Sequence, residues 1–98
     1  MSVLKQPAKA PLATADQLKS MSLGEIGWLV RKDWKRPYFG AVPYLQALCE
    51  LHDLSESYGM DPARQIVGYF LANAQTYRGS TARLVKAELN RRLKSRAA

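Results

Sequence analysis

Residues 31–45 read RKDWKRPYFGAVPYL, and this stretch predicts a corner at which two helices meet. Pro37 ends the first helix, because the residue before a proline is pushed out of the helical region of backbone space. Pro43 is tolerated in the first turn of the second helix, where its missing N–H would have no partner anyway. We interpret Tyr38 and Phe39, between the two prolines, as architectural residues that turn the chain. The stretch therefore predicts architecture, and it contains no catalytic pattern.

The helix that precedes the corner is expected over residues 23–35. Ser22 and Glu25 form a Ser-x-x-Glu capping box at its start, in which each side chain satisfies the backbone N–H of the other residue. At about 100° per residue, its large apolar side chains fall on one stripe, and these are Leu23, Ile26, Val30 and Trp34. Trp28 falls on the opposite side of the helix, among cations.

Three further helices are expected, over residues 42–57, 62–77 and 81–94. Gly59 is interpreted as the residue past the end of the second helix. Asp61 and Pro62 are interpreted as an N-cap followed by proline at the first helical position of the third. Gly68 and Ala72 would let another helix approach this third helix closely. No segment shows the alternating pattern of a β-strand.

With 98 residues the chain has room for one domain. We expect a compact all-α, four-helix domain over residues 22–98. Residues 1–21 carry few large apolar groups, so they are expected to form a flexible basic arm. Within this arm, Thr14 and Gln17 would cap a brief helical turn.

The net charge of the chain is +7, from 15 Lys and Arg against eight Asp and Glu. The positive charge lies toward the two ends: residues 37–77 hold one Arg and four acidic residues, whereas residues 78–98 hold seven basic residues and Glu88. A basic chain attracts polyanions and acidic protein surfaces. The composition is therefore compatible with DNA or RNA, and equally with an acidic protein surface, as a partner.

The single cysteine, Cys49, excludes an internal disulfide, and the N-terminus lacks the apolar block of a secretory leader. Both features lead us to expect a cytoplasmic location. The longest uncharged runs, 37–49 and 65–77, are 13 residues each. Since a membrane-spanning helix needs roughly 18 or more apolar residues, we expect no membrane segment.

Catalytic and metal-binding patterns are weak. Cys49 and His52 lie three residues apart, as a thiolate nucleophile and its base would on a helix, but no third orienting group follows. His52 and Glu56 alone are too few ligands for structural zinc. Glu50 and Asp53, with Glu56, indicate a solvated face, or a patch for a basic partner or a second copy of the chain. We therefore expect no enzyme activity, no metal and no cofactor.

Two sets of side chains are candidate nucleic-acid-binding residues. The first is Trp28 with the neighbouring cations Arg31, Lys32 and Lys35, because bases stack on aromatic rings while Lys and Arg meet phosphates. The second lies on the last helix and comprises Arg83, Lys86, Asn90, Arg91 and Lys94. Alternatives stay open for both sets. For the first, the arm or the last helix covers Trp28 and no binding face exists. For the second, the charges only keep the protein soluble, form an unspecific basic face, or belong to a helix-turn-helix around residues 78–80.

Several motifs occur in fixed order along residues 22–93. They are LGEI at 23–26, RKDWKRPYFGAVPYLQAL at 31–48, YGMD at 58–61, IVGYFLANAQTYRG at 66–79 and AR-x-x-K-x-ELN at 82–90. On these motifs the chain resembles small all-helical proteins of unassigned function from bacteriophages, prophages and plasmids. The resemblance implies a compact helical fold and an association with mobile elements, and it implies no activity. Two hypotheses follow: a non-enzymatic module that binds nucleic acid through basic faces of the 23–35 and 81–94 helices, and an accessory protein that binds and modulates a host protein.

Overall fold

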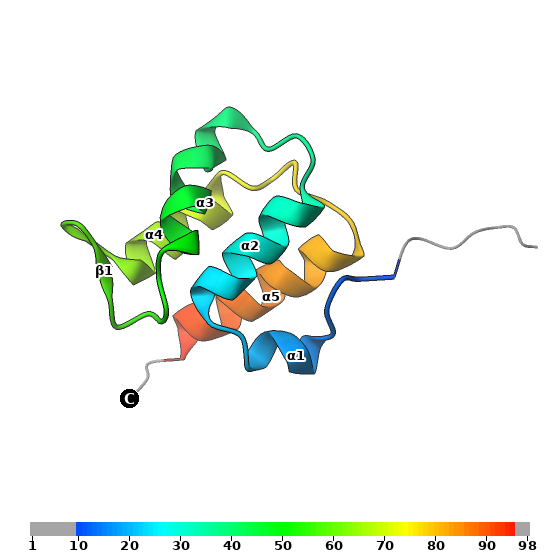
Figure 1. Cartoon of the computed structure of the whole chain (residues 1–98), viewed down its shortest axis with the longest axis horizontal. Coiled ribbons are helices and arrows are strands. Elements are labelled where there is room, and N and C mark those ends of the chain that lie inside the picture. The colour runs from blue at the N-terminus through cyan, green and yellow to red at the C-terminus, as the bar shows by residue number, and fades with distance from the viewer. Residues whose placement is uncertain (1–9, 96–98) are drawn as a thin grey trace, which may run out of the picture.

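The computed structural model describes residues 10–95, which are predominantly helical as the sequence predicts. In chain order its elements are α1 (Ala15–Lys19), α2 (Leu23–Asp33), a 3-10 turn η2 (Phe39–Ala41), α3 (Val42–Cys49), β1 (Ser57–Tyr58), β2 (Asp61–Pro62), α4 (Ala63–Ala72) and α5 (Ser80–Lys94). Figure 1 shows α2 in front of α5, with α1 below them, α3 and α4 to one side, and the strands at the far edge. The four-helix prediction is therefore incomplete, since the described residues hold five α-helices and a small hairpin.

The apolar stripe of α2 enters the core as predicted. Leu23, Ile26 and Val30 are fully buried, and the Ser22–Glu25 capping box is present at the start of the helix. Trp34 follows the last turn and anchors the corner, because its ring stacks on Tyr77 with centroids 4.9 Å apart. The buried stripe and this anchor fix the rotation of α2 about its axis, and hence which of its side chains face outward.

Two helices are shorter than expected. The predicted 42–57 helix ends at Cys49, because the chain turns so that the carbonyl of His52 accepts the N–H of Leu23 at 2.9 Å. The predicted 62–77 helix ends at Ala72, where the side-chain amide of Asn73 donates to the carbonyl of Tyr69. In both cases apolar residues continue past the helix end and reach the core from a non-helical segment.

A two-stranded antiparallel hairpin replaces the predicted end of the 42–57 helix. Ser57 pairs with Pro62 and Tyr58 pairs with Asp61. Gly59 lies in the turn between the strands with φ +62°, a left-handed conformation that glycine adopts without strain. Its prediction as a helix-ending residue is wrong, and so is the prediction of Asp61 as an N-cap, since both Asp61 and Pro62 belong to β2 and α4 begins after them.

Residues 12–21, which we expected in a flexible arm, pack on the domain. The capping box of Thr14 and Gln17 is confirmed, and Leu18 of α1 is fully buried. The backbone N–H of Leu12 donates to the Thr81 hydroxyl at 2.8 Å. The expectations for residues 1–9 and 96–98 lie outside the described residues.

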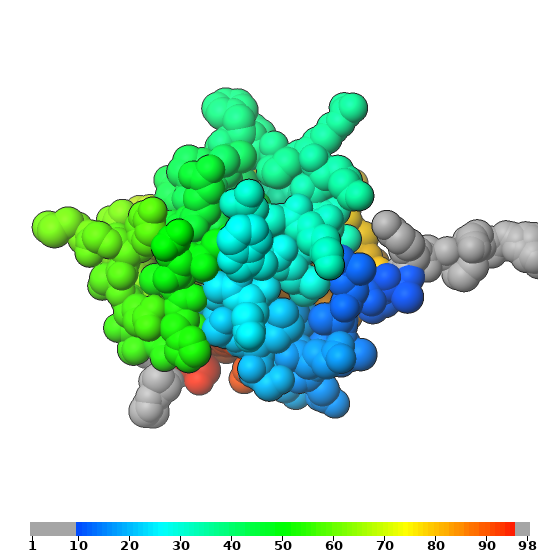
Figure 2. Space-filling view, viewed as in Figure 1, coloured from blue at the N-terminus to red at the C-terminus, as the bar shows by residue number. Residues whose placement is uncertain are grey.

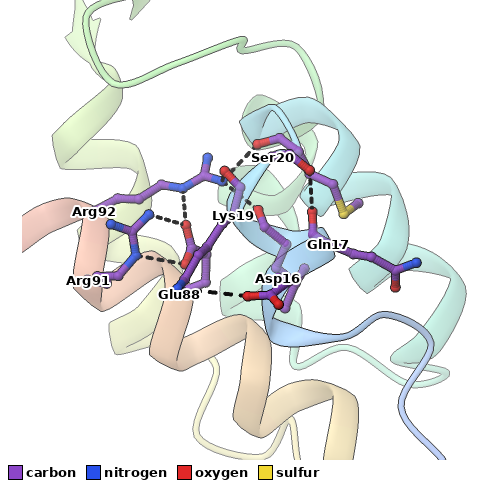
Figure 3. Close-up of polar contacts among 9 residues, drawn as sticks. Asp16, Gln17, Lys19, Ser20, Glu88, Arg91 and Arg92 are labelled. Atoms are coloured by element: carbon purple, nitrogen blue, oxygen red, sulfur yellow. Dashed lines mark hydrogen bonds and ion pairs between the residues drawn. The ribbon is translucent and has the colours of Figure 1, made fainter.

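Arg92 of α5 holds α1 in place (Figure 3). Its guanidinium donates to the carbonyls of Leu18 at 2.7 Å and Met21 at 2.8 Å, at the end of α1. Glu88 is only 5% exposed and pairs with both Arg92 and Arg91. These contacts lower the pKa of Glu88, first through the hydrogen bond from Arg91, so the carboxylate stays charged in the folded protein.

Candidate nucleic-acid interface

Trp28 projects from the outer side of α2, opposite the buried stripe. Its side chain is 59% exposed, so no described part of the chain covers it. An exposed indole is uncommon on a small protein, because burying an aromatic ring is strongly favourable. The alternative that the arm or the last helix covers Trp28 therefore does not hold for residues 10–95.

Arg31 lies one turn after Trp28 and places its guanidinium over the indole, with the guanidinium carbon 4.7 Å from the ring centroid. This is the geometry of a cation–π contact, worth about 0.5–1 kcal/mol at an exposed site. Arg31 also interacts with the thiol of Cys49, although burial outweighs that interaction and raises the pKa of Cys49. Arg31 thus places its positive charge beside the indole of Trp28.

A shallow hollow of about 530 Å³ opens beside the indole, and it is lined by Met21, Glu25, Trp28, Leu29, Arg31 and Lys32. Met21 and Leu29 are half-buried and form its apolar part. The Glu25 carboxylate accepts the backbone N–H of Ser22 at 2.8 Å, so it is directed to the start of the helix. Lys32 makes no hydrogen bond or ion pair within residues 10–95.

Lys35 and Arg36 extend the positive charge past the last turn of α2. Both are exposed and, like Lys32, have no partner in the described part of the chain. Arg36 was absent from the predicted set, although its position next to Lys35 in the sequence was a sufficient signal. We call Trp28, Arg31, Lys32, Lys35 and Arg36 the α2 basic surface.

The second predicted set lies on α5, and most of it is engaged in contacts within the protein. The Lys86 ammonium donates to the carbonyl of Tyr77 at 2.6 Å, and burial lowers its pKa. The Asn90 amide donates to the carbonyl of Lys86, and Arg91 pairs with Glu88 at 2.7 Å.

The two remaining cations of this set are Arg83 and Lys94. Both are exposed and have no partner among residues 10–95. They are therefore the α5 residues that still offer an unpaired charge to a ligand.

The structure does not join the two predicted sets into one surface. Because α2 and α5 pack against each other, the exposed side of each helix points away from the other. Figure 2 shows α2 across the middle of one face in cyan, with α5 almost wholly behind it. A short ligand on the α2 basic surface would therefore not touch Arg83 at the same time.

The arrangement of α4 and α5 does not match a helix-turn-helix. Such motifs join their helices by a turn of about three to four residues, whereas residues 73–79 separate α4 from α5. In addition, Thr81 and Ala82 at the start of α5 are buried, where a recognition helix would present base-reading side chains. Thr81 instead accepts the N–H of Leu12.

The residues considered for catalysis or metal binding serve local structure. Glu56 accepts the backbone N–H of His52 at 2.7 Å, and Asp53 accepts both the hydroxyl and the N–H of Ser55. The bonds from Ser55 lower the pKa of Asp53. The raised pKa of Cys49 is the opposite of what a thiolate nucleophile requires. Within residues 10–95, no three His, Cys, Asp or Glu side chains gather to hold a metal ion.

A second exposed surface was not predicted. Phe39 is 81% exposed and Tyr38 is 45% exposed, with their ring centroids 4.9 Å apart, so both rings at the corner face solvent. Tyr69 of α4 is also 45% exposed, and its ring centroid lies 5.3 Å from that of Tyr44. We call Tyr38 and Phe39, whose rings lie against each other, the aromatic patch. The uncharged run 37–49 of the sequence supplies it and was its only signal.

Comparison with known proteins provides no assignment for these surfaces. No family model matches the chain, and neither the curated proteins nor the solved structures give a significant match. Among the described residues, no helix is both long and apolar enough to cross a membrane. The function must therefore be argued from the side chains themselves.

Proposed function

We propose that this protein is a non-enzymatic binding module of mobile-element origin that binds nucleic acid through the α2 basic surface. One observation carries the proposal: Trp28 is 59% exposed, and it is followed by four exposed cations, two on α2 and two just past its end. The origin rests on the sequence motifs that resemble phage and plasmid proteins. Arg83 and Lys94 of α5 supply a weaker second contact for a long ligand.

The charge distribution supports this choice of surface. The ion pairs within residues 10–95 involve only Lys19, Arg91 and Arg92, so the cations of the α2 basic surface have no acidic partner to lose on binding a phosphate. The α5 cations Lys86, Arg91 and Arg92 would first have to give up internal contacts. Phosphate contacts dominate the affinity of nucleic-acid-binding proteins and make it depend on salt.

Fluorescence anisotropy of a labelled oligonucleotide, measured across a salt series, tests the proposal. We expect affinity to fall steeply with salt. Lys32→Gln and Lys35→Gln should each reduce the slope of log K against log salt by about 0.7–0.9, the contribution of one phosphate contact. Both side chains are exposed, so the variants should keep the far-UV circular dichroism of the wild type.

Lys94→Gln is the matched control, because it removes the same single charge from an exposed position on α5. It should change the slope by much less than Lys32→Gln does. An equal effect of both substitutions would show that only net charge matters and would refute the α2 basic surface as the site. Absence of binding at low salt would refute nucleic-acid binding altogether.

A second candidate function, binding and modulation of a host protein, is favoured by the aromatic patch. Protein interfaces are enriched in exposed aromatic residues and depleted of charge at their centres. The test is a pull-down from nuclease-treated host lysate with wild type and Phe39→Ser. A partner that survives the nuclease and is lost with Phe39→Ser supports this function, and a partner that the nuclease removes supports nucleic-acid binding. Phe39 is 81% exposed, so the substitution should leave the fold intact.

A further inference from the structure

We propose that the nucleic acid is single-stranded and that one unpaired base stacks on Trp28 in the hollow beside it. This inference rests on the proposed function, and it adds the class of ligand and the role of the indole. Phosphate contacts alone would need only the cations of the α2 basic surface. The exposed ring and the apolar wall next to it require a ligand that also offers a flat aromatic face.

The indole has one face that is already occupied and a hollow on its flank. Arg31 lies over the ring, with its guanidinium carbon 4.7 Å from the ring centroid. The hollow of about 530 Å³ lies within the range of about 300–1,000 Å³ that small-ligand sites have. A base would enter this hollow and take the indole face that Arg31 leaves open. Its edge would contact Met21, whose sulfur makes favourable contacts with aromatic rings.

The cations are placed for the backbone of the same strand. Lys32 lines the hollow, and Lys35 lies two residues past Asp33, the last residue of α2. Arg31 lines this hollow together with Lys32 and also lines a neighbouring hollow together with Lys35, so the three cations lie close enough to meet phosphates of one strand. Base stacking and phosphate pairing therefore occur on one surface, as single-strand binding requires.

A duplex does not satisfy this site. Its bases are stacked on one another, and exposing one face costs a few kcal/mol for unstacking and unpairing. The described residues around Trp28 also lack an apolar wedge that would enter between base pairs, since Met21 and Leu29 are half-buried. Duplex DNA would contact only the cations.

Three ligands of equal length separate these contributions, and the two single strands among them also have equal numbers of phosphates. The three ligands are an oligothymidylate of about a dozen nucleotides, within the site sizes of single-strand binders, an oligonucleotide of abasic sites, and a duplex. We expect Trp28→Ala to weaken oligothymidylate binding by roughly 5- to 150-fold, the effect of losing one stacked base. Binding of the abasic strand should be unchanged, because it has phosphates and no base.

A spectroscopic measurement reports the same contact directly. Trp34 is buried against Tyr77, so Trp34→Phe leaves Trp28 as the single indole of the chain. We expect its fluorescence to be quenched by oligothymidylate and to be unaffected by the abasic strand at equal saturation. Trp28→Phe, which keeps a smaller ring, should bind oligothymidylate with intermediate affinity.

The outcomes distinguish failure of this inference from failure of the proposed function. If Trp28→Ala weakens the abasic strand as much as oligothymidylate, the indole only positions cations and base stacking is refuted. If the duplex binds as tightly as oligothymidylate and Trp28→Ala changes neither, base stacking is again refuted while salt-dependent nucleic-acid binding stands. If no ligand binds at low salt, the proposed function fails and this inference fails with it.

Discussion

Gly24→Ala should destabilise the protein, and Gly68→Ala should stabilise it, although both replace a helical glycine. A Cβ at Gly24 would lie 2.8 Å from the carbonyl oxygen of Leu51 and 2.9 Å from that of Cys49. Both oxygens belong to the backbone, so relief of the clash requires α2 and the end of α3 to separate. A Cβ at Gly68 would have no atom within 4 Å.

The magnitudes follow from two opposing effects. Overpacking costs about 1–3 kcal/mol, and alanine gains about 0.5–1 kcal/mol over glycine in a helix. The net result for Gly24→Ala is a loss of about 1–2 kcal/mol in the free energy of unfolding, whereas Gly68→Ala keeps only the gain. For a domain of this size, about 1 kcal/mol corresponds to a shift of roughly 4–8 °C in Tm.

Urea and thermal unfolding, followed by circular dichroism, measure both variants under the same conditions. We expect their Tm values to lie on opposite sides of the wild type. A Gly24→Ala variant as stable as the wild type would show that α2 and α3 are not in backbone contact at this point. A loss of stability in Gly68→Ala would show that another part of the protein covers α4 there.

Arg92→Met should cost about 2–4 kcal/mol of stability and expose α1 amides to hydrogen exchange, because it removes the donor to the carbonyls of Leu18 and Met21 and one partner of Glu88. Arg91 is more exposed than Arg92, so Arg91→Met should cost less than about 1 kcal/mol. Equal losses in the two variants would contradict this reasoning. Folding lowers the pKa of Glu88. The carboxylate therefore contributes to the free energy of unfolding above about pH 4.3, and this contribution is lost as the pH falls through the pKa of Glu88 in the folded protein. Urea unfolding measured from pH 6 to pH 3 should therefore show a decrease in the free energy of unfolding of the wild type, and part of this decrease should be missing in Glu88→Gln. Tyr77→Phe should leave stability unchanged or raise it by up to about 1 kcal/mol, because the buried hydroxyl has no hydrogen-bond partner among residues 10–95. Burial and the nearby Asp33 carboxylate raise the pKa of Tyr77, and a clear loss of stability in the variant would show that its hydroxyl does bond to Asp33.

Local signals in the sequence predicted the structure best. The capping boxes at Thr14 and Ser22 each depend on residues three apart, and both form. The buried stripe of α2 follows from helical periodicity alone, which also placed Trp28 on the outer side. The exposed indole was therefore predictable, because a helix with one well-defined buried stripe determines the opposite side as well.

Signals that depend on tertiary contacts were misread. The apolar period continues through Leu51 and Tyr77, but these residues reach the core from turns. Periodicity alone cannot distinguish a buried residue on a helix from a buried residue in a turn that follows the helix. Gly68 was expected to admit a neighbouring helix, whereas Gly24 makes the close approach, because which glycine faces a partner depends on the packing of the whole domain. The hairpin around Gly59 was missed because its strands are two residues long.

The distribution of charge changes meaning once the contacts are known. Residues 78–98 hold seven of the 15 Lys and Arg and only one acidic residue, yet Arg92, Arg91 and Lys86 direct their charges to atoms of the protein itself. The α2 basic surface has fewer cations, and all four of them are exposed. Four contacts with a single strand predict a salt slope of roughly 3, from about 0.7 per phosphate. A measured slope well above this value would require cations beyond α2, and Arg83 and Lys94 are the exposed pair on α5 that would then have to contribute.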